Sequence, residues 1–200
     1  NVERCGGTPI IIDDVWGQPV DPGKVEDALK QHPDAKVLAF VHAETSTGAL
    51  SDAKALCALA QKYGCLTIVD TVTSLGGVPV NVDDWGADAV YSGSQKCLSC
   101  TPGLSPITFS DRVVELVGKR EQKCQSWFLD LKLLLGYWGE TTRTYHHTAP
   151  TNSLYALHES LLALQQEGLE QAWARHQSNH IALKEGLAAL GIEFVVAEQS

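Results

Sequence analysis

The sequence predicts an α/β fold built on a mostly parallel sheet covered by helices. Two observations support this. Short, almost continuously apolar segments alternate with amphipathic ones, and polar residues follow directly where several apolar segments end. Continuous apolar strands separated by helices are typical of a parallel sheet buried on both faces. Ligands bind beyond the carboxyl ends of the strands in such sheets, so we expect the functional site at that edge.

Six apolar segments are predicted to be strands. The clearest is residues 66–70, a β-branched run that ends in Asp70. The others are residues 9–12, 36–42, 88–92, 106–109 and, after Gly191, 192–197.

Amphipathic segments are predicted to be helices. Asp21-Pro22 should open a helix that reaches about Gln31, with proline at the first helical position. Ser51 is predicted to cap a helix that runs to Tyr63, and Gly64 should end it. Beyond residue 111, helices are predicted over residues 127–138, 152–166 and 169–190, with a break near Gly168.

The change in character near Pro150 predicts two domains. Residues 1–150 form a larger domain, and residues 151–200 form a helix followed by the start of a smaller α+β domain. The chain begins at Asn1 and contains no methionine, so we expect it to be a piece of a longer protein.

Composition excludes several classes of function. The 200 residues are 44% hydrophobic and 20% charged, as in a globular domain with a sizeable core. With a net charge of −9 and no basic cluster, a nucleic-acid interface is not expected, and no apolar run approaches the roughly 20 residues of a membrane span. Cys57, Cys65 and Cys97 lie in apolar or helical patterns typical of reduced thiols, which predicts a cytoplasmic protein, with the peroxisome as the eukaryotic alternative.

Asp70 and Lys96 are the candidate catalytic residues. Asp70 ends a buried strand, and Lys96 follows a later strand on a turn of small residues. A lysine there can form a Schiff base with an aldehyde cofactor, and a carboxylate can keep a pyridine nitrogen protonated. Each residue alone has an ordinary explanation, Asp70 as a loop cap and Lys96 as a solvated surface group.

Two further residues follow strand ends. Thr45 lies in the polar run of residues 42–48, where its hydroxyl would reach a phenolic oxygen of the cofactor or simply belong to a turn that caps the next helix. Val72 would lie against a flat ring or pack in the core.

Other motifs give weaker support for a functional site. Cys97-x-x-Cys100 has no second pair at zinc spacing and is followed by Pro102-Gly103, unlike a thioredoxin pair. His176 and His180 lack the glutamate of a zinc-protease helix. Dinucleotide, phosphate-loop and hydrolase-elbow motifs are absent from the sequence.

Three motifs together resemble the alanine–glyoxylate (serine–pyruvate) aminotransferases, class V enzymes of the fold-type I pyridoxal-phosphate group. They are residues 69–77 (Val-Asp-Thr-Val-Thr-Ser-Leu-Gly-Gly), residues 92–96 (Ser-Gly-Ser-Gln-Lys) and residues 145–148 (Tyr-His-His-Thr). The likeness covers essentially the whole chain. Cysteine desulfurases usually place histidine before the lysine, where this chain has Gln95.

This resemblance implies pyridoxal 5'-phosphate as the cofactor and transamination between alanine or serine and glyoxylate or another small 2-oxo acid. By resemblance, Lys96 forms the Schiff base, Asp70 pairs with the ring nitrogen and Val72 packs on the ring. Thr45 lies near the phenolic oxygen, and Gln95 contacts the phosphate. Tyr145 and Thr148 reach the phosphate of the neighbouring subunit, which implies a homodimer with shared active sites. The family's amino-terminal phosphate-binding turn and its carboxylate-binding arginine are expected to lie outside these 200 residues.

Two alternatives stay open. The chain could perform another class V reaction, such as aminoethylphosphonate transamination or a desulfurase-like elimination. It could also be a non-catalytic piece that serves as a dimerisation module.

Overall fold

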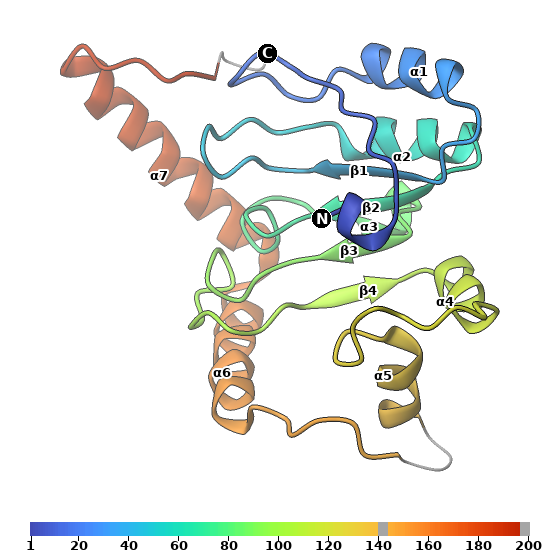
Figure 1. Ribbon diagram of the computed structural model, residues 1–200. Helices are drawn as coiled ribbons and strands as arrows, with labels where there is room; N and C mark the ends of the chain where they lie inside the picture. The colour runs from blue at the N-terminus through green and yellow to red at the C-terminus, as the bar shows by residue number, and fades with distance from the viewer. Residues whose placement is uncertain (140–143, 197–200) are drawn as a thin grey trace.

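A four-stranded sheet forms the centre of the protein in a computed structural model that describes residues 1–139 and 144–196 (Figure 1). The spatial order of the strands is β1-β2-β3-β4. The first three strands run parallel and β4 runs antiparallel to β3. The strands are β1 (Val37–Val41), β2 (Leu66–Asp70), β3 (Ala89–Tyr91) and β4 (Ile107–Phe109). The predicted strands at 36–42, 66–70, 88–92 and 106–109 and the mostly parallel sheet are therefore confirmed.

A helix precedes each of the parallel strands. They are α1 (Pro22–Gln31) before β1, α2 (Ala53–Lys62) between β1 and β2, and the short α3 (Val82–Trp85) before β3. The first two helices were predicted, and α3 was not. The Asp21 side chain caps α1 by accepting a hydrogen bond from the backbone N–H of Gly23 at 2.8 Å. The predicted cap of α2 was wrong by one residue, because Asp52 accepts from the Ala55 N–H and Ser51 Oγ accepts from the distant Val20 N–H instead.

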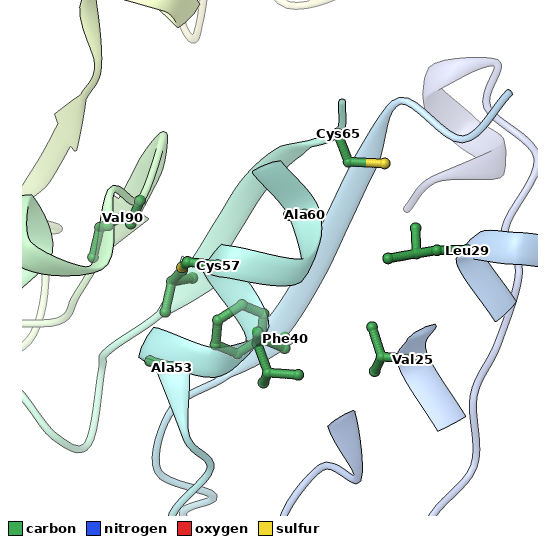
Figure 2. Packing of buried hydrophobic residues seen from close by; sticks show 11 residues of the cluster. Val25, Leu29, Phe40, Ala53, Cys57, Ala60, Cys65 and Val90 are labelled. Atoms are coloured by element: carbon green, nitrogen blue, oxygen red, sulfur yellow. The ribbon is translucent and has the colours of Figure 1, made fainter. Parts of the chain in front are cut away.

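The hydrophobic core lies between the sheet and α1 and α2 (Figure 2). Phe40 of β1 and Val69 of β2 point into it and meet Val25 and Leu56, which the helices contribute. The sequence predicted cover on both faces of the sheet, but Ile68, whose side chain points to the other face, keeps 39% of its surface exposed. The helical cluster therefore buries one face more completely than the other.

The second half of the chain is helical. It contains α4 (Asp111–Gly118), α5 (Leu131–Trp138), α6 (Thr151–Glu167) and α7 (Leu169–Ala189). Gly168 separates the last two helices at φ 89°, a value that favours glycine, so the predicted break is confirmed. In Figure 1, α6 and α7 lie on the side toward which the parallel strands point. The Ser160 hydroxyl of α6 contacts the carbonyl oxygen of Ser99 in the loop after β3.

Three predicted elements differ from the structure. Residues 9–12 form no strand, because they pair with no neighbouring strand and Ile11 stays exposed; a short 3-10 helix, η1 (Glu3–Cys5), precedes them. Residues 192–196 form no strand either, and Ala197 lies outside the described residues. The helix expected from residue 127 begins only at Leu131, where Asp130 caps it. Among the described residues, no helix is long and apolar enough to cross a membrane.

Candidate active site

The carboxyl ends of β1, β2 and β3 bring the predicted site residues to one edge of the sheet. Val41, Asp70 and Tyr91 end these strands and are paired in register, Val41 with Asp70 and Asp70 with Tyr91. The loops that follow carry Thr45, Val72 and Lys96 respectively. The topology thus brings these three loops to the edge of the sheet at which the sequence predicts a functional site.

Two hydrogen bonds hold the carboxylate of half-buried Asp70. Its Oδ1 accepts from the backbone N–H of Val72 at 2.8 Å, and its Oδ2 accepts from the Tyr91 hydroxyl at 2.5 Å. Burial first, and then the hydrogen bond to Asp70 and its negative charge, raise the pKa of Tyr91 to about 12. Tyr91 is therefore a protonated donor at physiological pH, and the carboxylate has a defined orientation.

Gly93 lies close to two residues that are predicted to contact the cofactor. A Cβ added at Gly93 would lie 2.7 Å from Gln95 Oε1 and 3.3 Å from Val72 Cγ1. The side chains of Val72 and Gln95 therefore both approach the position that a side chain at Gly93 would occupy.

Internal hydrogen bonds shape the loop that carries Lys96. The buried Ser94 donates from its hydroxyl to the carbonyl oxygen of Thr101 at 2.6 Å, and the Ser99 N–H donates to the carbonyl oxygen of Lys96 at 2.9 Å. Ser99 has a φ of 57°, the left-handed region that non-glycine residues seldom adopt. Lys96 itself is half-buried on this folded-back turn.

Two side-chain hydrogen bonds join the segment after β1 to the loop after β2. The Thr45 and Thr73 hydroxyls are 2.5 Å apart, and the buried His42 ring contacts the Ser74 hydroxyl through Nδ1 at 2.9 Å. Burial lowers the pKa of His42. The loop that carries Thr45 is therefore joined to the loop that follows Asp70 and carries Val72.

Tyr145 and Thr148 form a separate cluster. Their hydroxyls are 2.7 Å apart, and 75% of Tyr145 is exposed on the segment that leads into α6. Between them, His146 is buried against Trp127, with ring centroids 4.1 Å apart. No hydrogen bond within the described ranges links this pair to Asp70, Thr45 or Gln95.

Sequence reasoning gave no role to Tyr91 or Gly93. Tyr91 could have been found, because it ends a strand that lies next to β2. Its partner, however, depends on the pairing register, which a single sequence does not state.

Cys97, the first residue of the Cys97-x-x-Cys100 motif, is hydrogen-bonded within the fold. Cys97 donates from its thiol to the carbonyl oxygen of Thr73 at 3.3 Å, and burial raises its pKa. In the part of the chain that the structure describes, no three His, Cys, Asp or Glu side chains are grouped to hold a metal ion.

Comparison with known proteins identifies the family. The model of the aminotransferase class-V family matches residues 10–199. The chain belongs to the class V aminotransferases. Members of this class depend on pyridoxal 5'-phosphate, which agrees with the cofactor expected from the sequence.

Individual relatives support the assignment. The alanine–glyoxylate aminotransferase of Rattus norvegicus is 42% identical over 177 residues, which are 88% of this chain and 42% of the rat protein. The crystal structure of alanine–glyoxylate aminotransferase from Nostoc sp. superimposes with a TM-score of 0.93 at 46% identity, over 98% of this chain and 51% of that one. The ureidoglycine–glyoxylate aminotransferase of Bacillus subtilis gives a TM-score of 0.90 at 39% identity, over 94% of this chain and 48% of that one. The chain thus spans about half the length of these relatives.

Proposed function

We propose that this chain carries the lysine-bearing half of a pyridoxal-phosphate-dependent aminotransferase that moves an amino group from a small amino acid to glyoxylate or another small 2-oxo acid. The observation that carries this proposal is the placement of Asp70 at the end of β2 and of Lys96 in the loop after the adjacent parallel strand β3, in a class V sequence. The Asp70 carboxylate is already oriented by two donors.

The residues at the sheet edge fit the cofactor. Pyridoxal phosphate needs an amine for its aldehyde, a carboxylate for its ring nitrogen, an apolar contact for its ring and polar donors for its phosphate. Lys96, Asp70, Val72 and Gln95 offer these groups, and Gly93, which lies close to both Val72 and Gln95, leaves a side-chain-free position beside them. Thr45 would bind the phenolic oxygen from the neighbouring loop.

The bound cofactor would supply an electron-accepting ring, while the chain's own residues supply orientation and proton transfer. Asp70 would remain ionised and hold a proton on the ring nitrogen. Lys96 would bind the aldehyde, and its Nζ, once freed by the incoming amino acid, would take the proton from the substrate's α carbon as a general base. Val72 would fix the plane of the ring, because its branched side chain has few rotamers.

A homodimer with shared sites follows from the same assignment. Tyr145 and Thr148 would reach the phosphate bound by the partner. Their exposure on the segment before α6 and their mutual hydrogen bond support this role, since both hydroxyls are accessible and oriented together. We further propose that residues 1–150 form the cofactor-binding domain, that residues 151–200 lead into a smaller one, and that the protein is cytoplasmic, where its six free thiols would stay reduced.

Glyoxylate is the proposed acceptor because relatives from rat, Nostoc and Bacillus are named for it. The donor would be alanine or serine, with ureidoglycine as the competing donor named for the Bacillus protein. A panel of these donors with glyoxylate or pyruvate separates them, and the same panel with aminoethylphosphonate or cysteine tests the other class V chemistries.

Borohydride trapping tests the central assignment. Pyridoxal phosphate is added to the natural full-length protein, reduced with borohydride, and the modified lysine is located by mass spectrometry. Lys96 should carry the label, and Lys96→Ala should lose both label and turnover, whereas Lys54→Ala on the exposed surface of α2 should keep both. A label on another lysine refutes the catalytic role of Lys96. A protein that takes up no cofactor at all would favour the non-catalytic dimerisation module.

A further inference from the structure

We infer that Tyr91 is a positioning residue that aims the Asp70 carboxylate at the cofactor's ring nitrogen. The inference rests on the proposed function and adds to it a residue that acts through Asp70. Tyr91 donates its hydroxyl proton to Asp70 Oδ2 at 2.5 Å, directly across the paired strands β2 and β3.

The main chain of Tyr91 holds the same region. Its carbonyl oxygen accepts two hydrogen bonds from Thr71, one from the backbone N–H and one from the hydroxyl, each at 2.9 Å. Thr71 is the residue after Asp70 and is almost completely buried. Tyr91 therefore fixes the turn that carries the carboxylate as well as the carboxylate itself.

A phenol suits this task chemically. It donates a hydrogen bond without a positive charge, so it stabilises the carboxylate without competing with the charge on a pyridinium ring. Burial and the neighbouring carboxylate favour the protonated phenol over the phenolate. Each carboxylate oxygen can accept a second hydrogen bond, so Asp70 keeps room for the ring nitrogen after binding Tyr91 and the Val72 N–H.

The chain contains a matched control. Tyr63 also donates its hydroxyl proton to a carboxylate, Glu26 Oε1 at 3.0 Å, but between α2 and α1, away from the sheet edge. Tyr63→Phe and Tyr91→Phe remove the same group from the same kind of pair. Only Tyr91→Phe should affect the cofactor.

The test compares two ligands in the natural full-length protein: pyridoxal phosphate and its analogue with a carbon in place of the ring nitrogen. Tyr91→Phe should raise the Kd of pyridoxal phosphate on the order of tenfold, as expected for a lost hydrogen bond to a charged group. It should change the Kd of the carbon analogue less than about twofold, because that ligand cannot pair with Asp70. In an Asp70→Asn background the effect of Tyr91→Phe should disappear, since Tyr91 acts through Asp70. Thermal unfolding of each variant confirms that the mutants are folded.

Each other outcome is decisive. If Tyr91→Phe raises the Kd of both ligands equally, or if it still raises the Kd of pyridoxal phosphate in the Asp70→Asn background, Tyr91 merely supports the local structure and the inference is overturned. If neither ligand is weakened, the hydrogen bond does not orient Asp70 for binding. If wild-type protein binds neither ligand, the proposed function itself fails, and the inference fails with it.

Discussion

Replacement of Asp88 by alanine should destabilise the protein far more than replacement of its partner Arg112. Asp88 directly precedes β3, at the sheet edge opposite the candidate site, and its side chain is only 7% exposed. It accepts from the buried Thr67 N–H at 3.0 Å, from the Ser110 hydroxyl at 2.9 Å and from Arg112 Nη2 at 3.0 Å.

The two substitutions leave different groups without partners. Asp88→Ala leaves the Thr67 N–H, which is buried away from water, without an acceptor, and it also removes the acceptor of Ser110 and Arg112. We therefore expect a loss of about 3 kcal/mol in the free energy of unfolding. Arg112→Ala leaves Asp88 hydrogen-bonded to Thr67 and Ser110. Because the Arg112 side chain is 48% exposed, water screens and replaces much of its interaction, so we expect about 1 kcal/mol.

Equilibrium urea unfolding of the full-length protein at pH 7 measures both losses. The slopes should match wild type, so that the midpoints alone report stability. Folded Asp88→Ala should still bind pyridoxal phosphate with wild-type affinity, because the substitution lies at the other end of the strands. Equal losses for the two variants, or a large loss of cofactor affinity in Asp88→Ala at temperatures where it is folded, would refute the reasoning.

Three further results are expected. Hydrogen bonds from Lys62 and Tyr63 lower the pKa of Glu26 to about 2 from 4.5. This carboxylate therefore stabilises the fold above pH 4.5, and its contribution is lost as the pH falls toward 2. The urea midpoints of Glu26→Gln should vary less with pH across that window than those of wild type. Gly93→Ala should weaken pyridoxal-phosphate binding about tenfold in a spectroscopic titration, because its Cβ would lie 2.7 Å from Gln95 Oε1 and displace this proposed phosphate contact, while stability falls by only about 1 kcal/mol; unchanged affinity would contradict the proposed role of Gln95. Asp70→Asn should retain cofactor but lose most of kcat, and an undiminished rate would count against its pairing with the ring nitrogen.

The sequence was sufficient for the strands that carry the site. Turn residues bound their apolar runs, and each run has the length of a strand and is shorter than a typical helix. The antiparallel direction of β4 was not predicted, because it depends on the loop after Lys96 folding back rather than on the strand itself. The helix α4 was not predicted either, although Ser110 is a good cap for it.

Apolar character alone misled the prediction where no partner strand exists. Residues 9–12 and 192–196 contain branched apolar residues, but a strand is stabilised by pairing, and neither segment lies in the sheet. For the candidate site, Asp70 and Lys96 could be proposed from the sequence because the ends of apolar strands are visible in it. Tyr91 also ends a strand, but the role inferred for it depends on which residue it faces across the sheet, and a single sequence does not state this.

Two sets of interactions, core packing along β2 and the hydrogen bonds between Thr67 and Asp88, each require the observed pairing register of β2 with β3. Side chains alternate along β2, so Thr67 and Val69 point to the helical core while Asp70 points to the other face with Ile68. A slip of one residue would turn Asp70 into the apolar core and move it away from Tyr91. The reciprocal bonds between Thr67 and Asp88 at the start of the same strands require the same register, as Asp88 donates its N–H to Thr67 Oγ1 at 2.7 Å. Because core packing alone already selects this register, loss of Asp88 should lower stability and yet leave Asp70 facing Tyr91, which is why the two ends of these strands can be tested independently.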